Sequence, residues 1–158
     1  MSRIKIDDID RKILEILQEN ARITNAEIAR RVNLVPSATL ERVKRLEKLN
    51  VIKGYHACVD PIAVDLKFMA FVYIKTKDRF YKTFYDTFAK YREIQEIHHV
   101  AGEDCFLLKI RARDTQHFNK FLHNTLISID GVSDTRSVIV MDTEKETLSI
   151  PIENREDE

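Results

Sequence analysis

The chain has 158 residues, of which 44% are hydrophobic and 33% charged, with three glycines, three prolines and two cysteines. This composition is typical of a globular protein of one or two small domains, and it excludes a disordered chain and a disulfide framework. The 26 basic side chains equal the 26 acidic ones in number. Taken as an average, that balance argues against a nucleic-acid-binding protein.

The charges are, however, unevenly distributed along the chain. Residues 1–58 hold 12 Lys and Arg against 8 Asp and Glu, whereas residues 59–158 hold 14 against 18. This asymmetry predicts an anionic partner for the N-terminal part. Apolar runs are too short to span a bilayer, and the first residues lack the apolar stretch of a signal peptide, so we expect a cytoplasmic protein with no membrane partner.

Two helices are predicted near the start of the chain. Apolar residues recur at helical spacing over 8–19, and Asp7 and Asp8 are the candidate N-caps for that helix. Thr24 and Glu27 have the spacing of a capping box, in which each side chain accepts from the other residue's backbone amide. This pattern predicts a short second helix over 25–32.

A third helix is predicted over 36–49, after a connection of only three residues. Pro36 suits the first turn of a helix, because its missing amide hydrogen is not needed there. Leu40, Val43 and Leu46 form the predicted buried stripe. Two short helices joined by a tight turn, the second with a basic face, are typical of a helix-turn-helix, whose second helix enters the major groove of DNA.

The third helix supplies most of the predicted contacts to DNA. We expect Ser37 and Thr39 to allow close approach, and Arg42 and Arg45 to reach guanine or phosphate with their forked donors. The remaining phosphate contacts are predicted at Arg22, Asn25, Lys44 and Lys48. On charge pattern alone this helix could equally be a solvated amphipathic helix, and it is the capping box, the short turn and Pro36 that favour the helix-turn-helix.

Residues 6–61 resemble the DNA-binding domain of the Lrp/AsnC family of transcriptional regulators. The resemblance rests on the Asp-x-x-Asp-x-x-Ile-Leu pattern at 7–14 and on Ile-Lys-Gly-Tyr at 52–55. It implies a winged-helix-like helix-turn-helix and a sequence-specific regulator that is not an enzyme. Val35 departs from the family pattern, which commonly has a serine there, and its lack of a capping oxygen should weaken the helix start by ~1 kcal/mol.

The rest of the chain predicts an α/β arrangement. Residues 51–59 form a strand or hinge, and the elements that follow are strands at 68–74, 94–100, 106–112 and 132–141, helices at 80–91 and 115–127, and possibly a short strand at 148–150. The order β-α-β-β-α-β is ferredoxin-like, which makes the fold class α+β. Both helices would cover one sheet face, so the other face needs a partner, and a homodimer is the simplest.

The predicted domains follow from these elements. Residues 1–53 form the helix-turn-helix domain, 54–65 a hinge or linker strand, 66–152 the α/β domain, and 153–158 an acidic tail. In the first α/β helix, Phe80, Phe84, Phe88 and Tyr91 recur at helical spacing. We interpret this aromatic stripe as core packing and not as a ligand site.

The α/β domain resembles the family's regulatory (RAM) domain, through Val-Ala-Gly at 100–102 and Gly-Val-x-x-Thr at 131–135. This resemblance implies dimers that assemble into tetramers or octamers and bind a small amino-acid effector near the glycine loop. The implied effector contacts are Gly102, Glu103, Asp104, Cys105, Thr135 and Ser137.

Cys105 departs from that pattern, because family members use an aspartate at this position. A neutral thiol cannot pair with an ammonium group as a carboxylate does. Three alternatives stay open: Asp104 substitutes by a local shift, the site takes a different effector, or the site is silent.

Other chemistries are not supported by the sequence. His98 and His99 adjoin on a predicted strand and point to opposite faces, so we expect no metal site and no cofactor. Cys58 and Cys105 are expected to be buried, inert thiols. Siroheme decarboxylases share the two-domain layout, but this chain lacks their aromatic-rich C-terminal segment. A ligand-binding or assembly protein whose helix-turn-helix contacts only protein would differ by lacking salt-dependent DNA binding.

Overall fold

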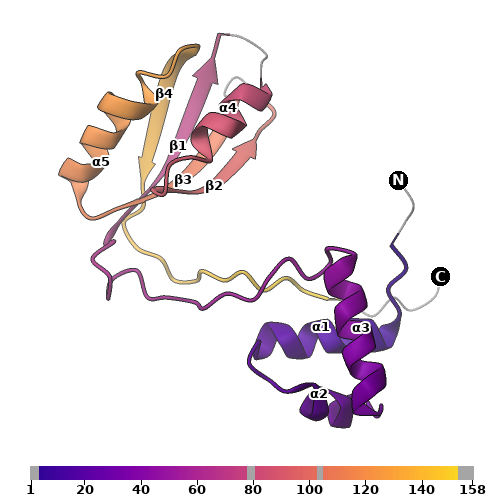
Figure 1. Ribbon diagram of the computed structural model, residues 1–158. Coiled ribbons are helices and arrows are strands. Elements are labelled where there is room, and N and C mark those ends of the chain that lie inside the picture. Colours follow the sequence, from indigo (N-terminus) through magenta and orange to yellow (C-terminus); the bar gives the residue numbers. More distant parts are fainter. Residues whose placement is uncertain (1–3, 78–80, 103–104, 153–158) are drawn as a thin grey trace. The chain divides into compact units, whose positions relative to one another are not determined.

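The structure, a computed structural model, describes residues 4–77, 81–102 and 105–152. The chain divides into two compact units, Met1–Cys58 with Glu146–Glu158, and Val59–Lys145 (Figure 1). The first boundary lies inside the predicted hinge. The second differs from the predicted one, because residues from 146 onward belong to the first unit and not to the α/β domain. The predicted acidic tail at 153–158 lies outside the described residues.

Three helices build the first unit: α1 (Asp8–Glu19), α2 (Asn25–Arg31) and α3 (Pro36–Lys48). All three predicted helices are therefore confirmed. Their apolar sides meet in one core of buried side chains, namely Ile13, Ile28, Val32, Val43 and Leu46. Leu40, which was predicted to be buried, is 37% exposed. The buried stripe of α3 instead runs through Thr39, Val43 and Leu46, which recur at the i, i+4, i+7 positions of one helix face.

The three helices begin with different caps. At α1, Asp7 accepts from the amide of Asp10 at 2.8 Å, and the Asp10 carboxylate accepts from the amide of Asp7 at 3.2 Å, a complete capping box. At α2, Thr24 accepts from the amide of Glu27 at 3.2 Å. The Glu27 carboxylate, however, pairs with Arg30 and not with the amide of Thr24, so only half of the predicted box forms.

The start of α3 has no side-chain cap. Val35 occupies the N-cap position and Pro36 the first turn, and no side chain accepts a hydrogen bond from the first amides. This agrees with the weakened start expected from Val35, since a helix leaves its first amides without partners unless a side chain supplies an acceptor.

The segments next to the first unit's helices form no strands. Residues 51–67 contain neither helix nor strand, so of the two alternatives for 51–59, a strand or a hinge, the strand does not form, and residues 148–150 add no strand either. A strand needs a neighbouring backbone with which to exchange hydrogen bonds. Ile150 finds a side-chain partner instead: its amide donates to Gln18 Oε1 at 2.8 Å, and its carbonyl accepts from Gln18 Nε2 at 3.0 Å.

The second unit is a four-stranded antiparallel sheet with helices on one face. Its elements in chain order are β1 (Phe68–Thr76), α4 (Tyr81–Phe88), β2 (Ile94–His99), β3 (Phe106–Ala112), α5 (Thr115–Phe121) and β4 (Val132–Ile139). The strand order is β2-β3-β1-β4, and β1 lies antiparallel between β3 and β4. The predicted ferredoxin-like arrangement is confirmed. The second predicted helix ends in a π-helical stretch, Leu122–Leu126.

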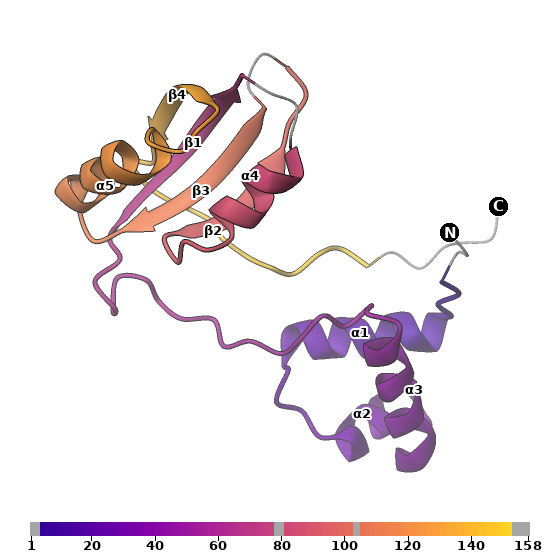
Figure 2. The same ribbon diagram turned by 45° about the horizontal axis from the view of Figure 1, so that its top comes forward.

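Aromatic residues close the core between the sheet and its helices. Figure 2 shows α4 and α5 lying on the same face of the sheet. Phe84 and Phe88 of the predicted aromatic stripe are buried there against Phe106, with ring centroids 5.8 and 5.5 Å away. Phe80 lies outside the described residues. Gly131, at φ +87°, lies so close to Phe84 that an added Cβ would come within 2.9 Å of the ring.

No helix in the described part of the chain is long and apolar enough to cross a membrane.

Candidate nucleic-acid interface

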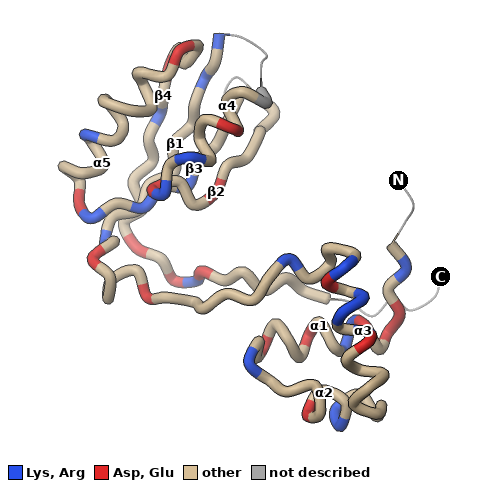
Figure 3. The backbone as a smooth tube through the Cα atoms, viewed as in Figure 1, with Lys and Arg blue, Asp and Glu red and all other residues tan. Residues whose placement is uncertain are grey.

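The third helix presents two chemically different faces. Val43 and Leu46 are buried against the other helices, whereas Ser37, Lys44 and Lys48 are exposed. Figure 3 shows that Lys and Arg concentrate on this helix within the first unit. The exposed face is thus polar and charged, with Glu41 and Glu47 beside the lysines, while the opposite face anchors the helix, which is the division that a groove-entering helix needs.

Thr39 does not belong to the exposed face. Its side chain is fully buried, and its hydroxyl donates to the backbone carbonyl of Val35 at 3.3 Å. The prediction that Thr39 faces DNA is therefore wrong. The physical reason is helical spacing, since position 39 shares a face with Val43 and Leu46.

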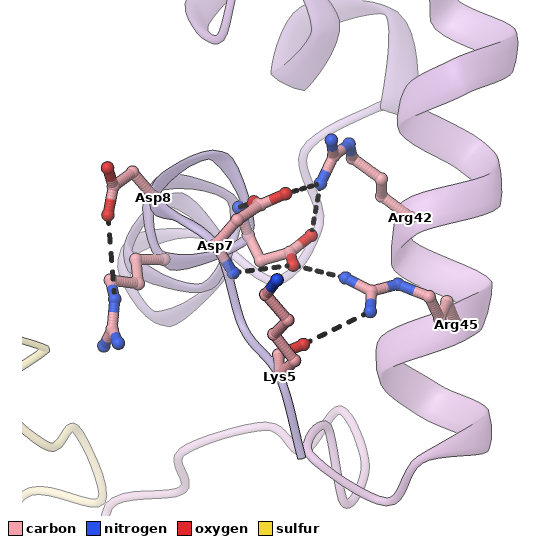
Figure 4. Close-up of polar contacts among 7 residues, drawn as sticks. Lys5, Asp7, Asp8, Arg42 and Arg45 are labelled. Atoms are coloured by element: carbon pink, nitrogen blue, oxygen red, sulfur yellow. Dashed lines mark hydrogen bonds and ion pairs between the residues drawn. The ribbon is translucent and has the colours of Figure 1, made fainter. Parts of the chain in front are cut away.

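Arg42 and Arg45 point toward the start of α1 (Figure 4). Arg42 Nη1 donates to Asp7 Oδ2 at 2.7 Å and to Asp10 Oδ1 at 2.9 Å. Arg45 Nη2 donates to Asp10 Oδ2, and its Nη1 donates to the carbonyl of Lys5 at 3.3 Å. We call Asp7, Asp10, Arg42 and Arg45 the α1–α3 ion cluster.

Burial and opposite charge stabilise the α1–α3 ion cluster. Asp10 is fully buried, whereas the side chains of Arg42 and Arg45 are 28% and 43% exposed. Partial burial acts to raise the pKa of Asp7, but the hydrogen bonds from Arg42 and from the Asp10 amide outweigh it and lower that pKa. The same carboxylates raise the pKa of Arg42. Both arginines are therefore bound within the domain.

The spacing of the charged residues in the sequence is compatible with this cluster. Asp7 and Asp10 are three residues apart, as are Arg42 and Arg45, so each pair lies on one side of its helix. The pattern does not reveal that the two pairs meet, because more than 30 residues separate them in the chain.

The start of α2 lies beside the exposed face of α3. Asn25 and Lys44 line the same shallow depression, together with Leu40 and Tyr55. Burial raises the pKa of Tyr55 to about 12, helped by its hydrogen bond to Glu47. Arg22 is exposed just before this helix. Four of the predicted contacts, at Arg22, Asn25, Lys44 and Lys48, thus remain at the surface of the first unit.

Two further arginines of α2 were not among the predicted contacts. Arg30 and Arg31 both pair with Glu27, and the hydrogen bond from Arg30 is the largest cause that lowers the Glu27 pKa to about 2. Arg31 also lies 3.7 Å from Glu19, so two carboxylates face the two arginines. The sequence indicates the pairing with Glu27 through the i, i+3 and i, i+4 spacing.

The predicted effector residues lie around the end of β1. The Cys105 amide donates to the carbonyl of Ile74 at 2.9 Å, and Thr135 is the cross-strand partner of Ile74 on the other side. Cys105 and Thr135 therefore lie on the two sides of β1, both next to Ile74. Ser137 pairs with Val72, one step along the same face. Glu103 and Asp104 lie outside the described residues.

Gly102 precedes this site in a conformation that favours glycine. Its φ is +138°, and an added Cβ would meet nothing within 4 Å. Glycine is therefore favoured at this position by backbone conformation and not by lack of space. Cys105 packs against the core of the second unit and is half-buried, whereas Cys58 is exposed, so the expectation of a buried Cys58 is wrong.

The sheet face opposite the helices is only partly covered by its own side chains. Phe71 and Tyr73 of β1 lie there beside their partners on β4, Val138 and Arg136. Val138 is 44% exposed. The guanidinium carbon of Arg136 lies 4.0 Å from the centroid of the Tyr73 ring, a cation–π contact.

The histidines of β2 have separate surroundings. His98 lies 3.0 Å from Glu96, which Lys109 also contacts at 3.0 Å, and the hydrogen bond with His98 is the largest cause that lowers the Glu96 pKa. His99 lies beside the Phe106 ring. Among the described residues, no group of three or more His, Cys, Asp or Glu could hold a metal ion.

Comparison with known proteins matches both units. Residues 6–53 match winged helix-turn-helix DNA-binding domains, and residues 69–150 match the Lrp/AsnC ligand binding domain. Leucine-responsive regulatory proteins of Klebsiella pneumoniae and Escherichia coli K12 are each 40% identical over 95% of this chain and 93% of their own length.

Solved structures match over nearly the whole chain as well. A transcriptional regulator of Neisseria meningitidis, crystallised in complex with L-Met, has a TM-score of 0.86 and 36% identity, covering 93% of this chain and 97% of that one. Escherichia coli AsnC has a TM-score of 0.85 and 26% identity, covering 93% and 99%.

Proposed function

Because the chain belongs to the Lrp/AsnC family of DNA-binding transcriptional regulators, we propose that it recognises its DNA sites through the exposed face of α3. The observation that carries this proposal is the division of α3, whose Thr39, Val43 and Leu46 anchor it while Ser37, Lys44 and Lys48 stay exposed. A helix presented in this way can enter the major groove and place its first turns against base edges.

The proposed contacts fall into two groups. Ser37 is small and lies in the first turn of α3, where it allows close approach to the bases. Lys44 and Lys48 lie about two and about three turns further along α3 and would bind phosphates, with Arg22 and Asn25 at the start of α2. Phosphate contacts of this kind set the affinity and the register, whereas base contacts set the specificity.

Mobility-shift titration against random-sequence DNA duplexes at several salt concentrations tests the interface. We expect Lys44→Ala and Lys48→Ala each to reduce the salt dependence of log K by about 1, since each removes one phosphate contact. Lys12→Ala, an exposed lysine on α1, is the matched control and should leave this slope unchanged. Absence of binding by the parent protein at low salt would contradict the proposal and favour a protein-contact role.

The uncovered sheet face supports a proposed homodimer. Phe71, Tyr73 and Val138 form an apolar centre on a face that no helix of the same unit covers. A second copy would bury these side chains, and a two-fold dimer fits a pseudo-palindromic DNA site. We further propose assembly of dimers into tetramers or octamers, acting in the cytoplasm by binding and without a catalytic step. Sedimentation of the full chain measures the oligomeric state.

An amino acid or a related small molecule is the proposed effector. One support is that Cys105 and Thr135 both lie next to Ile74, one on each side of β1, and that Gly102 is close by in the chain. The other is that the similar Neisseria meningitidis protein was crystallised in complex with L-Met. The effector could be held with Asp104 in place of the family aspartate, could be chemically different, or could be absent.

A thermal-shift screen of the twenty amino acids, run on the parent and on Cys105→Asp, distinguishes these cases. Stabilisation of the parent by one amino acid identifies an effector. Stabilisation of Cys105→Asp alone means that the thiol silences the site, because the restored carboxylate can pair with the ammonium group. No stabilisation of either protein would contradict an amino-acid effector.

A further inference from the structure

We infer that Arg42 and Arg45 are positioning residues, which fix the recognition helix α3 to α1 through Asp10, and that they do not contact DNA themselves. This inference rests on the proposed DNA-binding function and assigns different roles to the basic residues of one helix. Lys44 and Lys48 would carry the DNA contacts, while the two arginines would set the direction of α3.

The first support is that every carboxylate oxygen in the α1–α3 ion cluster accepts at least one hydrogen bond. Asp10 Oδ1 accepts from Arg42, and Asp10 Oδ2 accepts from Arg45 and from the amide of Asp7. Asp7 Oδ1 accepts from the amide of Asp10, and its Oδ2 from Arg42. The arginines therefore bind the two carboxylates of the α1 capping box, and moving Arg42 would leave Asp7 Oδ2 and Asp10 Oδ1 without these donors.

The second support is the burial of Asp10. Its carboxylate is fully buried while both arginines are in place, and each of its two oxygens accepts from a guanidinium. A buried charge that loses its partner is strongly unfavourable, because the group was already desolvated. An arginine that swung out to a phosphate would exchange a buried partner for a solvated one, and the equilibrium favours the buried pair.

The third support is charge balance. The two arginines and two aspartates of the cluster cancel, so they contribute little attraction for the phosphates of DNA. Within the described part of the chain, no ion pair holds Lys44 or Lys48. Their charges remain available to displace counterions from DNA.

Asp10→Asn distinguishes an arginine role in DNA contact from a role in positioning α3, because the two roles predict opposite changes in DNA affinity. Removing a negative charge close to bound DNA should strengthen binding if the released arginines contact phosphates. If they position α3, the same substitution should weaken binding, because the cluster that orients the helix is broken. The probe is the random-sequence duplex used above, titrated across salt concentrations with the full chain.

Asp8→Asn is the matched control, since it removes one negative charge from the same turn of α1. Asp8 is exposed, and its carboxylate lies 4.0 Å from Arg11, away from the cluster (Figure 4). We expect Asp8→Asn to leave affinity unchanged or to raise it slightly, and Asp10→Asn to lower affinity and the melting temperature together.

The salt slope provides the second readout. Arg42→Ala and Arg45→Ala should each lower affinity by a constant factor at every salt concentration, with the slope of log K against log salt unchanged. Lys44→Ala should lower that slope by about 1. Tighter binding by Asp10→Asn, or a slope reduced by about 1 in either arginine variant, would overturn the inference. If the parent and all variants alike fail to bind at low salt, the proposed DNA-binding function itself is wrong, together with this inference.

Discussion

The two units of this protein are stabilised in different ways. Among the residues that the structure describes, the first has five buried apolar side chains in its core and joins α1 to α3 through a fully buried aspartate and two arginines. Within the same described residues, the second has twelve buried apolar side chains in its core, among them Phe84, Phe88 and Phe106. A small domain has less apolar surface to bury, so polar contacts carry a larger share of its stability. The DNA-binding unit should therefore respond to charge and caps, and the sheet unit to packing.

Truncation in the aromatic core tests this comparison most strongly. Phe106 is fully buried and contacts the rings of Phe84, Phe88 and Tyr85. Phe106→Ala should lower the free energy of unfolding of the second unit by about 3–5 kcal/mol, because it removes these contacts and leaves a cavity. Hydrogen exchange resolved by peptide measures each unit separately. Equal loss of protection in α1–α3 would show that the two units do not unfold independently.

Substitutions at the helix caps should change the stability of the first unit alone, one lowering it and the other raising it. Thr24→Ala removes the side-chain acceptor at the start of α2 and should cost about 1 kcal/mol of unfolding free energy. Val35→Ser supplies an acceptor at the uncapped start of α3 and should add about 1 kcal/mol, since Val35 is 62% exposed and loses little packing. Urea unfolding measures both. A loss of stability in Val35→Ser would mean that the uncapped start is not a weak point.

Lowering the pH tests how much the charge of Asp7 stabilises the first unit, and it has the smallest expected effect on stability. The folded protein lowers the pKa of Asp7, so the stability from this group is complete above the ordinary aspartate pKa and is lost as the pH falls through the folded value. Asp7→Asn keeps a capping oxygen for the Asp10 amide but removes this titration. Between about pH 6 and about pH 3, the free energy of unfolding of the first unit should therefore fall by up to about 1 kcal/mol more in the parent than in the variant.

The control for that experiment is the second unit, to which Asp7 does not belong. Its exchange protection should change with pH equally in the parent and in Asp7→Asn. Parallel loss of first-unit stability in both proteins would contradict a stabilising charge on Asp7.

Local patterns in the sequence were sufficient for most of the secondary structure. The three helices of the first unit, the Asp7 and Thr24 caps and the β-α-β-β-α-β order all follow from signals within a few residues. Helical and strand periodicities and cap chemistry act over one or two turns, so they are readable without the fold. The zero net charge was uninformative for the same reason, because the relevant charges are local to α2 and α3.

The tertiary structure alone decided which side of α3 faces the protein. Leu40 and Thr39 are adjacent, and periodicity allowed either to join the buried stripe; packing against α1 and α2 buries Thr39 and exposes Leu40. On the same helix, Arg42 and Arg45 contact Asp7 and Asp10, more than 30 residues away in the chain. Pairing at such separations depends on how whole helices pack, and no local pattern in a single sequence contains it.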